Sequence, residues 1–219
     1  MNCSAGESTT KLGIEVLSSS SKNAKVTRRT KETVIDVEID FDQKELKIST
    51  GSGFLDHMIE SFAWWACVSL GVKVDSTRRL THTISEDTGI TIGQALRTIF
   101  EKRMNEHGVN AFGSGSAAVD EALSTATMVI EGRRNAFIRL SCEGAKTKPV
   151  EDLFSTDLVA FMEGLTQGLG ATLHMDLTHG NDPHHTWEAA FRALGVAISS
   201  AFQLNEWRKG ATIGIKGIL

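Results

Sequence analysis

The richest concentration of reactive side chains is the string His184-His-Thr-Trp-Glu188. Residues four apart lie on one face of a helix, so His184 and Glu188 could bind the same metal ion. His185 points about 100° away around such a helix and could bind a different ion. A single pair with this spacing is more often an exposed helical ion pair than a metal site.

The same spacing recurs in the first half of the chain, where His82 and Glu86 are four residues apart. An offset of 102 residues relates this pair to His184 and Glu188. Two pairs at equivalent positions of a repeat favour metal binding over two coincidental ion pairs. Thr83 occupies the position of His185 and is a poor metal ligand at neutral pH, so the two halves differ in chemistry.

Two histidines from other predicted elements, His57 and His174, complete the candidate ligand set. Either one alone is more often a structural histidine. Together with the helical pairs they form a set of nitrogen and oxygen donors, which suits manganese, iron, zinc or nickel. The candidate metal ligands are His57, His82, Glu86, His174, His184, His185 and Glu188.

Three basic residues, Arg133, Arg192 and Lys216, are candidates for binding an anion. Arg133 lies at the tip of a predicted hairpin and Lys216 lies in a glycine-rich tail, positions where phosphate donors are often found. Solvated surface is the competing interpretation for each of them.

The elements that must position these residues follow a pattern that occurs twice. In the first half we predict a hairpin of strands 31–40 and 45–50, a helix 54–66, a strand 70–74, and a helix from about 86 to 107 with Ser85 as its N-cap. In the second half we predict a hairpin of strands 122–131 and 136–141, a helix 152–168, a strand 171–177 and a helix 185–204. The expected fold is therefore α+β, a tandem duplication of a β-hairpin, helix, strand, helix (ββαβα-type) unit with sheets packed on helices.

The domain organisation follows from this repeat. Residues 1–24, with four serines at 18–21, are expected to form a flexible N-terminal arm. Residues 25–108 form the first half, and residues 109–219 form the second half with a C-terminal tail. The glycine- and serine-rich segment 108–116 is expected to link the halves.

Composition excludes several classes of protein. The 219 residues carry a net charge of −4, so no overall positive field would recruit nucleic acid. No stretch approaches the roughly twenty apolar residues that a membrane helix needs. Three scattered cysteines and the absence of an apolar leader segment favour a reducing compartment, and we expect a cytoplasmic protein.

Several segments resemble the imidazoleglycerol-phosphate dehydratase family, and the resemblance covers about residues 27–219. The segments are Arg28–Thr33, Gly53–Met58, His82–Gly89, Asp120–Leu123, Gly132-Arg133 and Gly180–Ala193. The resemblance implies a metal-dependent hydro-lyase of histidine biosynthesis that converts imidazole glycerol phosphate to imidazole acetol phosphate. It also implies the duplicated fold and a homo-oligomer, a 24-mer or its trimeric building block, with metal sites between protomers.

The resemblance also implies roles for individual residues. The seven candidate ligands correspond to the ligands of two manganese ions, although other divalent metals remain open. Arg133, Arg192 and Lys216 correspond to the binding site for the substrate phosphate. The candidate catalytic residues are Glu32, Asp120, Glu86 and Glu188.

The sequence departs from the family pattern at several of these positions. Thr83 replaces an expected histidine, which predicts that one of the two metal sites is weakened. Ala111 replaces an expected phosphate-binding arginine, and Arg192 an expected lysine. Two interpretations therefore stay open. One is a divergent working dehydratase, and the other is a paralogue with reduced or redirected chemistry that acts as a metal-binding, ligand-binding or structural assembly protein.

Overall fold

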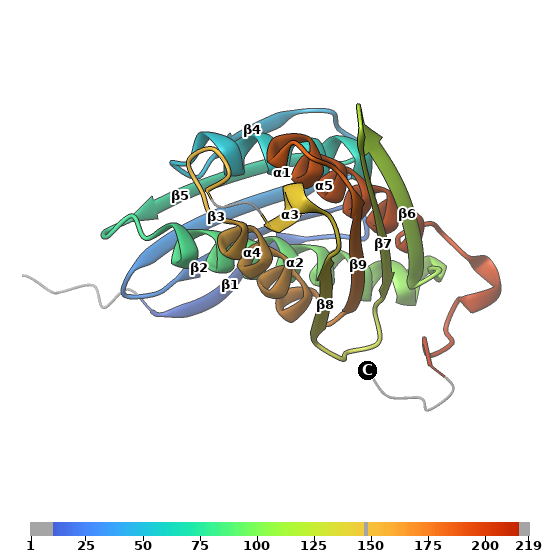
Figure 1. Cartoon of the computed structure of the whole chain (residues 1–219). Coiled ribbons are helices and arrows are strands. Elements are labelled where there is room, and N and C mark those ends of the chain that lie inside the picture. The colour runs from blue at the N-terminus through green and yellow to red at the C-terminus, as the bar shows by residue number, and fades with distance from the viewer. Residues whose placement is uncertain (1–10, 147–148, 215–219) are drawn as a thin grey trace, which may run out of the picture.

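The computed structural model describes residues 11–146 and 149–214, which form two β-sheets and the helices packed on them (Figure 1). The first repeat contains β1 (Gly13–Ser19), β2 (Asn23–Arg29), β3 (Thr33–Asp40), β4 (Leu46–Ser49), α1 (Gly53–Ala66), β5 (Ser69–Ser76) and α2 (Thr81–His107). The second contains β6 (Phe112–Val119), β7 (Ala122–Val129), β8 (Asn135–Leu140), α3 (Glu143–Lys146), α4 (Ser155–Leu169), β9 (Thr172–His179) and α5 (Pro183–Ala201), followed by the short 3₁₀ helix η1 (Glu206–Arg208). None of the helices in these described ranges is long and apolar enough to cross a bilayer.

The order of strands confirms the predicted duplication. The five-stranded sheet has the order β1-β2-β3-β5-β4 and the four-stranded sheet has the order β6-β7-β9-β8. Strands β2, β3, β5 and β4 are therefore equivalent to β6, β7, β9 and β8. In both sheets the last pair, β4 with β5 or β8 with β9, is parallel, and the other pairs are antiparallel.

The two predicted hairpins are wrong in the same way. Strand 31–40 does not pair with 45–50, and strand 122–131 does not pair with 136–141, because β5 or β9 lies between them. Each unit places a helix between its two parallel strands, and a helical crossover is the connection that parallel strands need. The predicted hairpins were inferred from turn-forming residues, which indicate where a strand ends but do not indicate which strands pair.

The predicted flexible arm of residues 1–24 is wrong from Gly13 onward, while residues 1–10 lie outside the described chain. Strand β1 pairs with β2, with Val16 opposite Val26. The serine run ends this strand and forms the turn, because the Ser20 hydroxyl accepts hydrogen bonds from the backbone N–H groups of Lys22 and Asn23. The polar residues therefore form a tight turn between two strands.

The predicted glycine-serine linker is also mostly strand, because residues from Phe112 onward form β6. Helix α5 packs closely on β6, and a Cβ at Gly113 would overlap the carbonyl oxygen of Ala197. Gly113 and Gly115 are therefore required by close packing.

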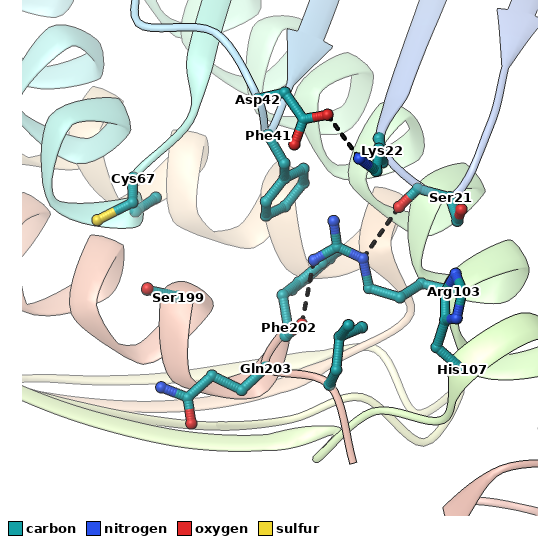
Figure 2. Close-up of a pocket in the computed structure, with 12 residues that line it drawn as sticks. Ser21, Lys22, Phe41, Asp42, Cys67, Arg103, His107, Ser199, Phe202 and Gln203 are labelled. Atoms are coloured by element: carbon teal, nitrogen blue, oxygen red, sulfur yellow. Dashed lines mark hydrogen bonds and ion pairs between the residues drawn. The ribbon is translucent and has the colours of Figure 1, made fainter. Parts of the chain in front are cut away.

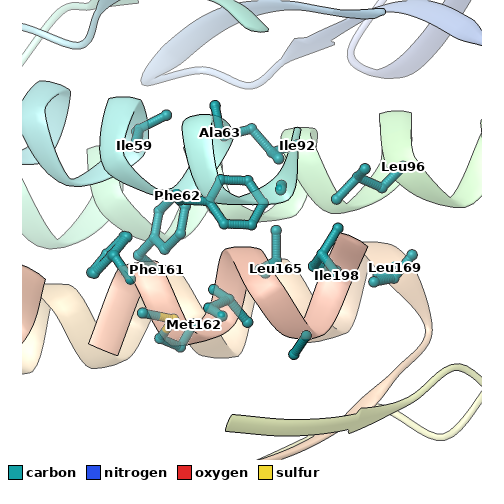
Figure 3. Packing of buried hydrophobic residues seen from close by; sticks show 14 of the residues in the cluster. Ile59, Phe62, Ala63, Ile92, Leu96, Phe161, Met162, Leu165, Leu169 and Ile198 are labelled. Atoms are coloured by element: carbon teal, nitrogen blue, oxygen red, sulfur yellow. The ribbon is translucent and has the colours of Figure 1, made fainter. Parts of the chain in front are cut away.

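The helices pair across the two repeats, α1 with α5 and α2 with α4. Figure 3 shows the buried side chains between these helices, including Phe62, Leu165 and Ile198. Helix α2 begins at Thr81 and not near Glu86, so the predicted N-cap Ser85 lies buried inside it. Its earlier start places His82 on the helix with Glu86.

Candidate metal centre

Three side chains converge where the N-terminal parts of α1 and α5 meet. Nε2 of His57 lies 3.5 Å from Oε2 of Glu188, and Nε2 of His184 lies 3.7 Å from the same oxygen. In the described part of the chain, this is the one group of three or more potential ligands whose donor atoms all lie within 4.8 Å of one another. We call His57, His184 and Glu188 the metal trio.

The start of α5 holds its two histidines in place. Asp182 is the N-cap, and its Oδ1 accepts hydrogen bonds from the backbone N–H of His184 at 2.7 Å and of His185 at 3.2 Å. Pro183 stands in the first turn, where its fixed φ suits a helix and its missing N–H costs nothing. The sequence Asp-Pro-His-His therefore fixes the backbone from which both rings project.

A carboxylate orients the His184 ring. Nδ1 of His184 lies 3.2 Å from Oε1 of Glu151. When a neutral ring donates Nδ1–H to Glu151, its Nε2 carries a lone pair, and this lone pair faces Oε2 of Glu188. Two acceptors that face each other need a cation or a proton between them, so this donor set fits a divalent metal.

Glu188 divides its two oxygens between two partners. The residue is only 8% exposed, and its Oε1 accepts hydrogen bonds from Nε of Arg192 at 3.1 Å and from Nη2 at 2.6 Å. Burial by itself raises the pKa of Glu188, but the bonds from Arg192 and the nearby His57 outweigh it and hold the pKa below its ordinary value. The carboxylate is therefore ionised, with Oε2 left to face the histidines.

A cavity of about 410 Å³ opens beside the metal trio. Its walls include Phe54, Glu151 and Asp152. Asp152 also accepts hydrogen bonds from the backbone N–H of Gly53 and Phe54, which ties this loop to the first turn of α1. A small molecule in this cavity would lie against His57 and His184.

Comparison with known proteins shows the family to which the chain belongs. The family model for imidazoleglycerol-phosphate dehydratase matches residues 50–198, which include the metal trio. The chain is 34% identical over 201 residues to the imidazoleglycerol-phosphate dehydratase of Streptococcus sanguinis, covering 90% of this chain and 100% of that protein. It is 37% identical over 201 residues to that of Endomicrobium trichonymphae, covering 90% and 98%. The chain belongs to the imidazoleglycerol-phosphate dehydratase family.

Solved structures of the family share the fold. The crystal structure of the dehydratase from Pyrococcus furiosus superposes with a TM-score of 0.71 at 32% identity, covering 88% of this chain and 99% of that one. The enzyme from Staphylococcus aureus gives a TM-score of 0.72 at 26% identity, covering 84% and 99%. Both the resemblance and the predicted fold class are thus confirmed, and the named relatives are hydro-lyases.

In this family member His185 faces a different environment from its neighbour. Its Nδ1 lies 3.0 Å from Oε2 of Glu121, and its Nε2 lies 3.8 Å from Oδ2 of Asp120. Glu121 also accepts hydrogen bonds from the backbone N–H of Asp182 and Asn181, and these bonds together with His185 lower its pKa to about 2. The bond to Glu121 in turn raises the pKa of His185.

Glu121 and Glu151 are the residues that sequence reasoning missed. Glu121 immediately precedes β7 and Glu32 immediately precedes the equivalent strand β3, so these two are the repeat partners. The family resemblance pointed instead to Asp120, the residue immediately before Glu121. Glu151 has a φ of 53° in the loop before α4, and no pattern pointed to it.

The first-repeat pair, His82 and Glu86, has no third ligand within the described chain. The nearest acidic partner of His82 is Asp157, at 3.9 Å from its Nδ1. Helices α1 and α4 are equivalent in the two repeats, and each ends at a C-cap in the left-handed conformation, Cys67 or Gly170. Ten residues before this C-cap, α1 carries His57 and α4 carries Ala160, whose methyl group cannot bind a metal. The two repeats therefore differ at the ligand that would complete the site.

Two further predicted site residues, the metal ligand His174 and the catalytic residue Glu32, lie apart from the metal trio. His174 is exposed on β9 and stacks on Phe137 with ring centroids 4.7 Å apart, beside an open cavity of about 480 Å³. Glu32 lies 3.7 Å from Arg78 at the surface, and its carbonyl accepts from Thr77. Neither side chain converges with another candidate ligand of the described residues.

The three predicted phosphate ligands are not brought together by one chain. Arg133 is exposed in the loop after β7, whereas Arg192 lies near the opposite end of that strand, where its Nη1 donates to the carbonyl of Ala118. The strand rise separates these two ends by about 20 Å. Lys216 lies outside the described residues. A phosphate site built from these residues stays a prediction and would need more than one copy of the chain.

Proposed function

We propose that this chain catalyses the metal-dependent dehydration of imidazole glycerol phosphate to imidazole acetol phosphate, a step of histidine biosynthesis. Family membership supports the reaction. The single observation that carries the metal dependence is the convergence of His57 and His184 on one oxygen of Glu188. We further propose manganese as the ion and the cytoplasm as the compartment, where the free thiols of Cys67 and Cys142 would stay reduced.

The residues of this chain would divide the work as follows. His57, His184 and Glu188 would hold the divalent ion, which when bound supplies a Lewis acid to stabilise negative charge on the substrate. Glu151 orients the His184 ring, and Arg192 keeps Oε1 of Glu188 away from the ion. The cavity beside Phe54 gives the substrate a place next to these ligands.

Dehydration removes a proton from one carbon and a hydroxyl from the next, and the enol formed becomes a ketone. A base and an acid are needed, and Asp120 and Glu32 are the side chains proposed for these proton transfers. The distance of 3.8 Å between Oδ2 of Asp120 and Nε2 of His185 supports such a role for Asp120. Glu32 occupies the corresponding turn of the first repeat.

The phosphate of the substrate would be bound by Arg133, Arg192 and Lys216 drawn from neighbouring copies in a homo-oligomer, a trimer or the 24-mer that it builds. Charge-assisted hydrogen bonds from arginine suit a phosphate. Arg133 supports this part of the proposal because its side chain is exposed, far from the metal trio of its own chain.

A direct assay tests the proposed activity. Purified protein is supplied with Mn²⁺ and imidazole glycerol phosphate, and formation of the ketone product is measured. We expect turnover in the wild type, a loss of at least about 100-fold in Glu188→Gln, because an anionic ligand is removed, and no change in Glu163→Gln on the exposed face of α4. Absence of the ketone product with metal-loaded wild-type protein would contradict the proposal.

One observation favours the second candidate, a metal-binding assembly protein with reduced chemistry. Thr83 stands where the second repeat carries His185, and Ala160 stands where the first repeat carries His57. Under this alternative the protein binds about one metal per chain, forms its oligomer and gives no ketone in the same assay.

A further inference from the structure

Another cavity, of about 410 Å³, lies at the other end of the helices that carry the metal trio (Figure 2). It is bounded by the last residues of α1, α2 and α5, including Ala66, His107 and Phe202. Glu188 and Phe202 are separated by about 21 Å of helix, so this cavity is distinct from the proposed active site.

Arg103 of α2 is buried against this cavity without a counter-ion. The residue is only 9% exposed. Its Nε donates to the carbonyl of Ser21 at 2.9 Å and its Nη1 donates to the carbonyl of Phe202 at 3.1 Å. Nη2 donates to no atom of the described residues, and Figure 2 shows this third nitrogen pointing away from both carbonyls.

The charged groups around the cavity leave the guanidinium charge unpaired. Asp42 is the acidic residue in the lining, and its carboxylate forms an ion pair with Lys22 at 2.8 Å. His107 adds a group that can be positive, beside Glu106 at 3.6 Å. Burial lowers the pKa of Arg103, with only a smaller opposing effect from Asp42. A buried charge with carbonyl partners alone keeps part of its desolvation cost, which an anion would offset.

The wall beside this charge is aromatic. The Arg103 guanidinium lies 4.1 Å from the centroid of the Phe41 ring, and Phe41 stacks on Phe202 with centroids 5.3 Å apart. Leu204 and the Ala66 methyl extend the apolar surface. A ligand that fits both features has one negative group and a flat apolar body, and the volume suits a molecule of that size.

We propose that this cavity binds a small aromatic carboxylate, whose carboxylate accepts hydrogen bonds from Nη2 of Arg103 and whose ring lies against Phe41. The carboxylate would complete the donors of Arg103 and compensate its charge. The aromatic ring would displace water from the apolar wall. This inference stands apart from the proposed dehydratase activity, because it involves none of the metal trio.

Benzoate is the probe, titrated by calorimetry into the full-length, metal-loaded protein, with acetate as the matched anion without a ring. We expect benzoate to bind at least about tenfold more tightly than acetate. Arg103→Gln should weaken benzoate binding by at least about tenfold, since a charge-assisted bond is lost. The control Arg97→Gln changes an arginine of the same helix that pairs with Glu101 outside the cavity, and should bind benzoate as the wild type does.

A second variant keeps the proposal testable if Arg103→Gln does not fold. Ser199 lines the cavity from α5, so Ser199→Leu fills part of it while leaving Arg103 in place. We expect Ser199→Leu to weaken benzoate binding as well. Absence of benzoate binding in the wild type, or wild-type affinity in Ser199→Leu, would overturn the site. Equal affinity for acetate and benzoate would overturn the aromatic ligand class.

Discussion

The contacts of Arg192 within the chain add a second candidate role to its predicted one. The sequence predicts a phosphate ligand, but the structure places its Nε and Nη2 on Oε1 of Glu188 and its Nη1 on the carbonyl of Ala118. Each of its three nitrogens therefore already donates one hydrogen bond within the chain. In this arrangement Arg192 orients Glu188, a candidate metal ligand, and a phosphate bound to Arg192 would have to compete with this carboxylate.

Replacing Arg192 separates these two roles. We expect Arg192→Ala to lower the affinity for Mn²⁺ by about tenfold, because Oε1 of Glu188 becomes free to rotate, and Arg192→Lys to lower it less. Mn²⁺ titration followed by electron paramagnetic resonance measures this effect without turnover. An unchanged Mn²⁺ affinity together with a raised KM for the phosphorylated substrate would instead assign Arg192 to the phosphate.

Glu151 provides a second test at the scale of one residue. Its carboxylate orients the His184 ring through Nδ1, and its own φ of 53° is unusual for a residue other than glycine. We expect Glu151→Gln to weaken Mn²⁺ binding by about 10- to 100-fold. Glu163→Gln, an exposed glutamate on α4, is the control and should match the wild type. Equal affinities in all three proteins would show that His184 needs no such partner.

Helix pairing is the element-scale feature that the sequence could not reveal. Periodicity predicted α1 and the spacing of His184 and Glu188 well, because both depend only on local geometry. It did not predict that α1 packs on α5, so His57 could be named as a candidate ligand but its convergence with His184 and Glu188 could not be predicted. The predicted strand pairs were wrong for the same reason, because strand pairing depends on contacts between residues far apart in the sequence.

Glycines allow the backbones of α2 and α4 to pack closely against each other. A Cβ at Gly93 would overlap the backbone carbonyl of Leu165, whereas Gly53 on α1 has no atom within 4 Å of such a Cβ. We expect Gly93→Ala to destabilise the protein by about 1–3 kcal/mol and Gly53→Ala to have little effect. Urea unfolding followed by circular dichroism measures both. Similar stability of the two variants would mean that α2 and α4 can move apart enough to accommodate a methyl group at position 93 without cost.

Equivalence of α2 and α5 predicts the effect of restoring a histidine at position 83. Thr83 is the repeat counterpart of His185, and His82 and Glu86 remain available beside it. We expect Thr83→His to raise bound Mn²⁺ from about one toward two per chain, measured by elemental mass spectrometry, and to increase turnover. If the wild type already binds two ions equally tightly, and Thr83→His changes neither the bound metal nor the turnover, then Thr83 does not weaken metal binding.

At the scale of the whole molecule, the candidate site is distributed over distant surfaces. The metal trio lies at the start of α1 and α5, His174 lies on the exposed face of β9, and Arg133 follows the far end of β7. One chain cannot bring these groups together without unfolding its sheets. Residue types and spacing could therefore single out the candidate residues, whereas joining them in one site would need contacts between copies of the chain, which a single sequence does not encode locally.

Removal of the metal tests whether copies of the chain share the sites. If ligands such as His174 join the histidines of a neighbouring copy, metal binding is linked to assembly, and each stabilises the other. We expect treatment with a chelator to shift the protein from a large symmetric oligomer toward smaller species, measured by light scattering after gel filtration, and added Mn²⁺ to reverse the shift. His174→Ala should lose this recovery while keeping the metal trio of each chain. A stable monomer that retains two bound metals, or an oligomer that chelation and His174→Ala leave unchanged, would contradict shared sites, because the ligands would then have to converge within one chain.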